Sequence, residues 1–291
     1  MNHNPLRRLF ALGQSIWLDY IDRDLLIDGS LSRLIERDAL RGMTSNPGIF
    51  ERAISNSSCY DADIRTLHTA NADTAAIYDA LSRRDVQMAA DTFRQVYADS
   101  NGRDGYVSLE VAPHLAYDTG RTIDEGRRLW KSLDRANVMI KVPATRAGLA
   151  AIRELTADGI NVNVTLLFGL ARYREVAQAY LDGIDARLSS GLAVNGIQSV
   201  ASLFVSRIDT LIDAQLVDVP VSAAESVRGG VGIASARLAY QIYREIFAGA
   251  NFAARAAHGA SSQRLLWAST STKTPGVSDV RYVEALIGPD T

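Results

Sequence analysis

The run Val138-Met139-Ile140-Lys141-Val142-Pro143 is a short apolar stretch that carries one charged side chain, and it is typical of a buried strand. Lysine is scarce here, since of the 31 basic residues only Lys131, Lys141 and Lys273 are lysine. Arginine keeps its proton in proteins, whereas a desolvated lysine can give its proton up. Lys141 is therefore a candidate nucleophile for Schiff-base formation with a carbonyl. The alternatives are a lysine at a strand end whose amine reaches solvent, or a lysine that is paired with a buried carboxylate.

The composition indicates a globular protein with a sizeable core. The chain has 291 residues, of which 47% are apolar and 22% charged. Its formal net charge of -2 gives no electrostatic footprint for nucleic acid or an anionic membrane, and suits a small anionic ligand better. Cys59 is the only cysteine, which excludes an internal disulfide and a thiolate metal site. We expect a cytoplasmic protein, since a single cysteine is compatible with a reducing compartment and no apolar run approaches the length of a membrane span. No metal is expected, because the four histidines, His3, His68, His114 and His258, show no ligand spacing.

Short strand-like runs alternate with helical patterns along most of the chain. The strand-like runs are Ser15–Ile21, Gly42–Ser45, Gly105–Val111, Val138–Val142, Val162–Phe168, Ser199–Val205 and Gln263–Ser269. The clearest amphipathic stretches are Thr122–Asp134, Ala147–Ala157, Leu170–Leu188 and Ile233–Phe247. Such alternation predicts βαβ units and a parallel sheet. No linker rich in Pro, Gly or Ser divides the chain, so we expect a single domain over residues 1–291.

Two segments depart from this alternation. The stretch from Pro47 to Asp104 is longer than an ordinary crossover, and its middle, Thr74–Ala98, has apolar residues at helical spacing, which predicts inserted helices at about 48–104. The small-residue stretch Ala248–Ser262 is interpreted as a loop or a mobile flap before the seventh strand, or equally as a plain surface connection. The run Gly229-Gly230-Val231-Gly232 does not follow a strand, so it indicates the start of a helix. The run Arg281–Ile287 predicts another short helix.

The sheet could be an open doubly wound sheet or a (β/α)8 barrel. No glycine-rich nucleotide-binding turn is present, which disfavours the open sheet. Strand alternation places Asn163 and Thr165 on one face and Val164 and Leu166 on the other. Polar residues interrupt the apolar strands at Asp19, Glu110, Lys141, Asn163, Thr165 and Ser202. A (β/α)8 barrel explains this pattern, because residues near the carboxyl ends of its strands converge on one site.

The strands and their flanks contain an ordered series of motifs. These are Trp17-Leu18-Asp19, Thr44-Ser45-Asn46-Pro47, Val107-Ser108-Leu109-Glu110-Val111, Ile140-Lys141-Val142-Pro143-Ala144-Thr145, the run 159–168 (GINVNVTLLF), and Ser202-Leu203-Phe204-Val205-Ser206-Arg207. Together they resemble the transaldolase family of Schiff-base-forming aldolases. The resemblance covers most of the chain and implies a (β/α)8 TIM-type barrel with Lys141 on the fourth strand.

The resemblance implies a catalytic role for residues on four strands. Lys141 is expected to attack the C2 carbonyl of a ketose phosphate. Asp19 is expected to remove the proton of the C4 hydroxyl during carbon–carbon cleavage and to return it in the reverse direction. Glu110 and Thr165 are expected to hold the water that carries protons while the imine forms and breaks. No cofactor is expected, because the protonated imine acts as the electron sink.

The resemblance also implies how the sugar phosphate is bound. The residues expected to hydrogen-bond the covalently attached three-carbon unit are Asn46, Asn163 and Ser202. Arg207 is the expected phosphate-binding arginine, because a guanidinium fork can grip a phosphate in a bidentate manner. Some family members have a second arginine after the seventh strand, where this chain has none. Here Ser269 and Lys273 could replace it with a hydroxyl and a point charge, although an ordinary polar loop explains these residues equally well.

The family continues into an eighth strand and a closing helix, which this sequence does not contain. We therefore expect a truncated barrel, completed by a further C-terminal segment or by a homodimer partner, since seven strands leave edges unpaired. The expected activity is that of a transaldolase of the pentose phosphate pathway, acting on sugar phosphates. The alternatives are a fructose-6-phosphate aldolase-type enzyme, which releases dihydroxyacetone instead of transferring it, and a weakly active sugar-phosphate-binding protein.

Overall fold

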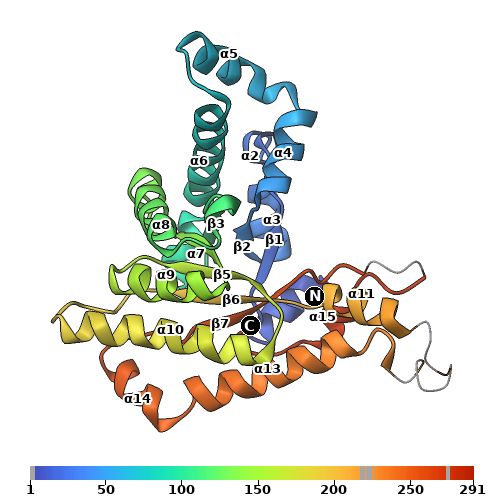
Figure 1. Ribbon diagram of the computed structural model, residues 1–291. Helices are drawn as coiled ribbons and strands as arrows, with labels where there is room; N and C mark the ends of the chain where they lie inside the picture. Colours follow the sequence, from blue (N-terminus) through green and yellow to red (C-terminus); the bar gives the residue numbers. More distant parts are fainter. Residues whose placement is uncertain (1–3, 217–219, 221–224, 226, 273–275) are drawn as a thin grey trace. The chain divides into compact units, whose positions relative to one another are not determined.

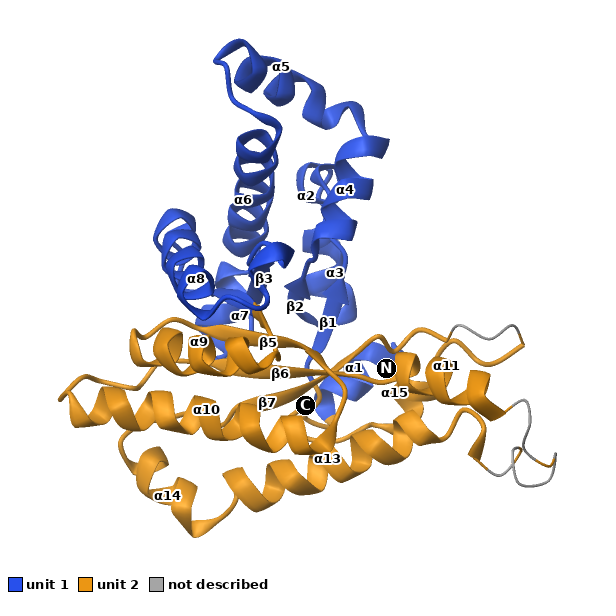
Figure 2. Cartoon of the chain, in the orientation of Figure 1, with its two compact units in different colours: residues 1–11, 15–141 blue, residues 12–14, 142–291 orange. Residues whose placement is uncertain are grey.

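The computed structural model describes residues 4–216, 220, 225, 227–272 and 276–291. The chain forms two compact units, one of residues 1–11 and 15–141 and one of residues 12–14 and 142–291 (Figure 2). Seven strands lie in the sheet in chain order, from β1 to β7. Every strand pair whose register is described is parallel.

The first unit contains the first three strands, most of β4 and all the inserted helices (Figure 1). Its elements are α1 (Pro5–Ala11), β1 (Ile16–Asp19), α2 (Arg23–Ile27), α3 (Ser30–Asp38), β2 (Leu40–Thr44), α4 (Pro47–Asn56), η1 (Ser58–Tyr60), α5 (Asp61–Thr69), α6 (Thr74–Thr92), α7 (Arg94–Asp99), β3 (Tyr106–Glu110), η2 (Pro113–Leu115), α8 (Thr119–Leu133) and β4 (Val138–Pro143). The strands pair so that Asp19 lies beside Thr44 and Glu110 beside Lys141. The predicted strands of this unit are therefore confirmed to within a few residues.

The predicted insertion is helical, as its apolar spacing indicated. Helices α4, α5 and α6 are grouped beyond the strands of this unit, with α5 between the other two (Figure 1). They enclose a small apolar cluster of their own around Ala53, Tyr60 and Leu81. Asp73 caps α6, because its carboxylate accepts a hydrogen bond from the backbone N–H of Ala76 at 2.8 Å. The insertion thus has local start signals and an apolar core, which is why it folds as helices.

A buried charged network joins the inserted helices to the segment that follows β1. Arg23, at the start of α2, donates to Asp85 on α6 and to Asp63 on α5, the latter at 2.8 Å. The Tyr60 hydroxyl donates to Asp85 at 2.8 Å and accepts from the Arg23 backbone N–H at 2.9 Å. The Asp85 side chain is fully buried, so its charge depends on these partners for compensation.

Replacing Asp85 with alanine is expected to lower the free energy of unfolding by about 3 kcal/mol, because Arg23 and the Tyr60 hydroxyl each lose a buried partner. Urea denaturation measures this loss. Asp91→Ala is the matched control, since Asp91 also accepts from arginines but its side chain is 41% exposed. The control is expected to cost less than about 1 kcal/mol. Equal losses in the two variants would contradict the prediction.

The second unit contains the remaining strands and the helices that pack on them. Its elements are α9 (Arg146–Ala157), β5 (Val162–Leu167), α10 (Leu170–Ser189), β6 (Ser199–Phe204), α11 (Ser206–Gln215), α13 (Val231–Phe247), α14 (Ala250–Ala257), β7 (Arg264–Ala268) and α15 (Arg281–Ala285). The predicted start of a helix at the 229–232 glycines is confirmed, because α13 begins at Val231 directly after Gly230. The short helix predicted after residue 280 is confirmed as α15.

The prediction of a loop or mobile flap at Ala248–Ser262 is wrong. Helix α14 occupies residues 250–257 of this stretch. Phe252 is buried in it, and its ring lies edge-on to that of Phe247 with centroids 5.2 Å apart. Arg255 forms an ion pair with Asp185 of α10 at 2.5 Å. Alanine favours the helical conformation, and the contact of Phe252 and the ion pair of Arg255 hold this helix in place. The composition of the segment, which is rich in small residues, did not reveal these two contacts.

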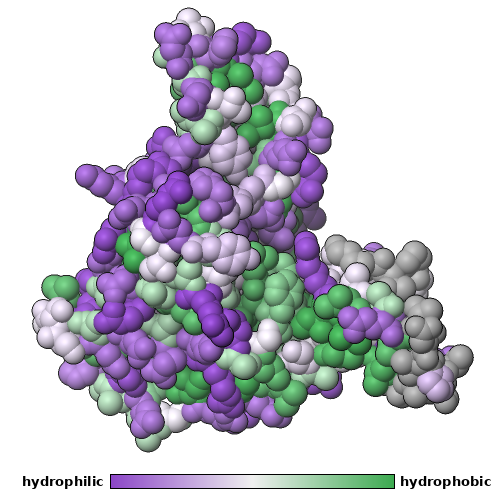
Figure 3. Space-filling model, viewed as in Figure 1, coloured by the Kyte–Doolittle hydropathy of each residue, from purple (hydrophilic) through white to green (hydrophobic). Residues whose placement is uncertain are grey.

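The strand order and the intervening helices confirm the predicted fold class, an incomplete (β/α)8-type arrangement with seven parallel strands. The single domain over residues 1–291 stays a prediction. On the face drawn in Figure 3, hydrophilic residues cover much of the outer surface of the helices. Among the described residues, no helix combines the length and the hydropathy required to span a bilayer.

Candidate active site

Lys141 is held in the first unit by two oxygen atoms, one from the residue that follows β2 and one from a side chain on β3. Its side chain is buried, with only 6% of the residue exposed. Its Nζ donates to the backbone carbonyl of Ser45 at 3.0 Å and lies 3.5 Å from Glu110 Oε2. The register of β3 and β4 places Glu110 directly beside Lys141, so both side chains lie on one face. The predicted convergence of this amine and this carboxylate is confirmed.

Glu110 is a carboxylate whose surroundings favour its protonated form. Burial raises the pKa of its carboxyl group, the Lys141 ammonium opposes this rise, and the Asp19 carboxylate adds to it. Asp19 lies at the end of β1 and is exposed, close enough for its charge to act on Glu110. A carboxyl group with a raised pKa can exchange protons closer to neutral pH, as general acid–base catalysis requires.

Sequence reasoning did not assign a role to Ser45, although the residue lies in one of the quoted motifs. Ser45 is fully buried, and its hydroxyl donates to the backbone carbonyl of Ser108 at 2.8 Å. This bond fixes the Ser45 peptide, whose own carbonyl accepts from Lys141. The only sequence signal is a hydroxyl residue directly after a strand. Asn46, the next residue, caps α4 by accepting from the Ile49 N–H at 3.0 Å, so its Nδ2 group is the part that could donate to a substrate.

The pH dependence of imine formation is expected to reflect the raised pKa of Glu110. In the wild type, the rate of cyanoborohydride trapping is expected to fall as the pH is lowered, because Glu110 takes up a proton. This acidic limb of the pH profile should lie above about pH 4.3, the ordinary pKa of a glutamate side chain. Glu110→Gln is expected to lose this limb and about 10²-fold in rate. Asp19→Asn is expected to retain the limb at a lower pH, because its negative charge no longer raises the pKa of Glu110. An unchanged limb in Glu110→Gln would refute the assignment.

Removing the Ser45 hydroxyl is expected to slow imine formation by about ten-fold, because the carbonyl that orients the Lys141 amine loses its anchor. KM should change little, since Ser45 does not bind the substrate in this arrangement. Single-turnover trapping of Ser45→Ala measures the effect. Ser45→Thr keeps a hydroxyl and should restore most of the rate; equal rates in the two variants would exclude a role for the hydroxyl.

The second unit brings together the predicted amide and hydroxyl residues of β5 and β6. Asn163, Thr165 and Ser202 are all buried. The Ser202 hydroxyl donates to Asn163 Oδ1 at 2.7 Å, so these two side chains orient each other. The Thr165 backbone carbonyl accepts from the Ala144 N–H at 2.8 Å.

The alternation expected for residues 163–166 does not continue to Leu166. Leu166 has a φ of 55° and is 48% exposed. The pairing of β5 with β6 shifts register between Val164 and Leu167, so the alternation breaks directly after Thr165. A positive φ at a bulky residue such as leucine is rare and costs energy, and such strain is often found at functional sites. The local sequence carries no glycine that could have signalled this break.

Arg207 and Ser269 lie at the starting end of α11. Arg207 is the second residue of α11 and is exposed, with its guanidinium carbon 5.7 Å from the centre of the Phe204 ring. Ser269 directly follows β7; its carbonyl accepts from the Ser206 N–H and its hydroxyl contacts the Ser206 hydroxyl, both at 3.0 Å. Lys273 lies outside the described residues. The structure thus places one of the two predicted partners of Arg207 at the same helix start.

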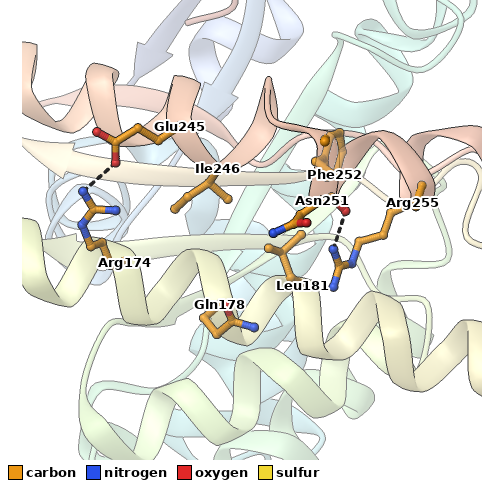
Figure 4. A pocket seen from close by; sticks show the side chains of 10 residues that line it. Arg174, Gln178, Leu181, Glu245, Ile246, Asn251, Phe252 and Arg255 are labelled. Atoms are coloured by element: carbon orange, nitrogen blue, oxygen red, sulfur yellow. Dashed lines mark hydrogen bonds and ion pairs between the residues drawn. The ribbon is translucent and has the colours of Figure 1, made fainter.

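A surface cavity of about 660 Å³ in the second unit has a different character (Figure 4). Helices α10, α13 and α14 line it, and no strand contributes. Arg174 pairs with Glu245 at 2.7 Å, and Arg255 donates to Asp185, so carboxylates already neutralise both arginines. None of the predicted catalytic residues lines this cavity. Elsewhere in the described part of the chain, no group of His, Cys, Asp and Glu has the make-up of a metal site.

The fold and the strand-borne lysine define a class of protein, the (β/α)8-type enzymes with a lysine–carboxylate pair on adjacent strands. The family model described as Transaldolase/Fructose-6-phosphate aldolase matches residues 16–291, and the chain belongs to this family.

Curated relatives match almost the whole chain. A protein named Transaldolase from Thiobacillus denitrificans is 49% identical over 288 residues, which cover 99% of this chain and 80% of that protein. Transaldolase 2 from Nostoc sp. is 48% identical over 297 residues, with 99% and 78% covered. Transaldolase from Saccharopolyspora erythraea is 48% identical over 289 residues, with 99% and 78% covered.

Proposed function

We propose that this protein is a transaldolase of the pentose phosphate pathway. It transfers a dihydroxyacetone unit from sedoheptulose 7-phosphate or fructose 6-phosphate to glyceraldehyde 3-phosphate or erythrose 4-phosphate. The observation that carries the proposal is the buried Lys141 amine, 3.5 Å from Glu110 on the neighbouring strand. Membership of the family and the names of the curated relatives support it.

In the proposed mechanism, the neutral Lys141 amine attacks the C2 carbonyl of the ketose phosphate. A neutral amine has two N–H bonds and one lone pair. The Ser45 carbonyl and the Glu110 carboxylate can accept from the two N–H groups, which leaves the lone pair free to point at the substrate. The carbinolamine then loses its hydroxyl as water to give the protonated imine. Glu110, helped by Thr165, holds the water that carries these protons.

Asp19 is proposed to act in the carbon–carbon step. It takes the proton from the C4 hydroxyl, the C3–C4 bond breaks, and the bonding electrons move into the protonated imine to give an enamine. The aldose phosphate leaves, and the reverse sequence joins the enamine to the acceptor aldehyde. The protonated imine supplies the electron sink, so these steps require no metal or other cofactor.

The binding assignments follow the same proposal. Asn46, Asn163 and Ser202 hydrogen-bond the attached three-carbon unit, and the preset bond between Ser202 and Asn163 supports a fixed orientation for it. Arg207 binds the phosphate group together with Ser269, and Lys273 adds a point charge. We place the enzyme in the cytoplasm, where its single cysteine, Cys59, stays reduced. We also propose that the protein forms a homodimer.

Borohydride reduction in the presence of fructose 6-phosphate tests the nucleophile. The expected product is a stable adduct of one dihydroxyacetone unit on Lys141, located by intact-mass and peptide mass spectrometry. Lys141→Arg keeps the positive charge but cannot form an imine, so it should fold and yield no adduct. Lys131→Arg is the matched control, because it is the same change at a helical lysine and should leave trapping intact.

An adduct on the Lys141→Arg variant would show that another residue is the nucleophile. No adduct on the folded wild type would instead favour the binding-protein alternative. The products distinguish the remaining alternative, the fructose-6-phosphate aldolase type. Free dihydroxyacetone that accumulates in the presence of an aldose phosphate acceptor would identify an aldolase, whereas a new ketose phosphate identifies the transferase.

A further inference from the structure

The first turn of α11 carries an exposed arginine and a buried aspartate on opposite sides. Arg207 is exposed, whereas Asp209 is 2% exposed. Residues two apart in an α-helix are separated by about 200° around its axis. Asp209 therefore contacts other elements of the second unit, whereas Arg207 is exposed to solvent. The position of the arginine depends on how firmly the aspartate holds the helix.

A single carboxylate joins α11 to two other elements of the same unit. Asp209 Oδ1 accepts from the backbone N–H of Gly232, in the first turn of α13, at 2.7 Å. Asp209 Oδ2 accepts from the hydroxyl of Tyr282, on α15, at 2.8 Å. Tyr282 is itself 5% exposed, so this bond is shielded from water. Hydrogen bonds to an ionised group are stronger than those between neutral groups.

The packing around this carboxylate is tight enough to require a glycine. A Cβ atom at residue 232 would lie 2.5 Å from the Val205 carbonyl oxygen and 3.1 Å from Asp209 Oδ2. One turn further along α11, Asp213 accepts from the Gly229 N–H at 3.0 Å. The Gly229 carbonyl in turn accepts from Arg281 of α15 at 2.7 Å. Asp209 thus binds α13 and α15 directly, and Asp213 binds Gly229, which precedes α13 and is itself bound by α15. Figure 1 shows α11, α13 and α15.

We infer that Asp209 and Tyr282 are positioning residues for recognition of the substrate phosphate, acting through Arg207. They hold the helix start that carries Arg207, so the guanidinium does not have to be ordered when the phosphate binds. The segment after β7 thereby contributes to the preference for phosphorylated sugars through the Tyr282 hydroxyl. This inference rests on the proposed role of Arg207.

Tyr282→Phe removes only the hydroxyl and tests the inference. The dissociation constant for inorganic phosphate, measured by calorimetry on the full chain, is expected to rise about five-fold, the effect of one lost hydrogen bond. KM for fructose 6-phosphate should rise by a similar factor, while kcat/KM for unphosphorylated fructose stays the same. Asp209→Asn, which keeps an acceptor oxygen but loses the charge, should act in the same direction.

Tyr240→Phe is the matched control. The Tyr240 hydroxyl donates to the Pro289 carbonyl at 3.2 Å, so it also contacts the segment after β7, but it does not contact Asp209. This variant should bind inorganic phosphate like the wild type. An unchanged phosphate affinity in Tyr282→Phe, or an equal loss with fructose and fructose 6-phosphate, would overturn the inference. The absence of a borohydride adduct on the wild type would overturn the proposed function instead, because phosphate binding is measured without any chemistry.

Discussion

The placement of one amine beside one carboxylate, both withdrawn from water, is the constraint on which the rest of the site depends. Parallel pairing of β3 and β4 sets Glu110 next to Lys141, and burial favours the protonated form of the carboxyl group. Each group alone would be costly to bury in ionised form, and together they offset that cost. The Ser45 carbonyl adds a third fixed point, so the amine is oriented before a substrate arrives.

In the second unit, hydrogen bonds between side chains likewise hold the polar groups in position before a ligand binds. Ser202 and Asn163 fix each other on adjacent strands, and Ser206 joins the start of α11 to Ser269. Behind this helix start, Asp209 binds both α13 and α15. A side chain that is held in place loses less entropy when it binds a ligand. The cost of ordering these groups is therefore met during folding.

The inserted helices contribute stability close to a proposed catalytic residue. Arg23 starts the helix that follows β1, only four positions after Asp19, and its guanidinium is bound by carboxylates from α5 and α6. The insertion has its own apolar cluster, so it can hold these carboxylates rigidly. Two carboxylates on different helices bind this guanidinium, so they restrict the position of the segment that follows β1.

The sequence by itself determined the strands, the inserted helices and the candidate catalytic and binding residues. Apolar periodicity and polar interruptions are local signals, and Lys141, Glu110 and Thr165 stood out on them. It did not determine the role of Ser45, whose carbonyl meets an amine 96 positions away, nor the exposure of Leu166 after a register shift. The sequence also did not indicate that residues 250–257 form the helix α14, which one aromatic contact and one ion pair hold in place. These features depend on pairing between distant segments, and only the tertiary structure decides which backbone groups meet.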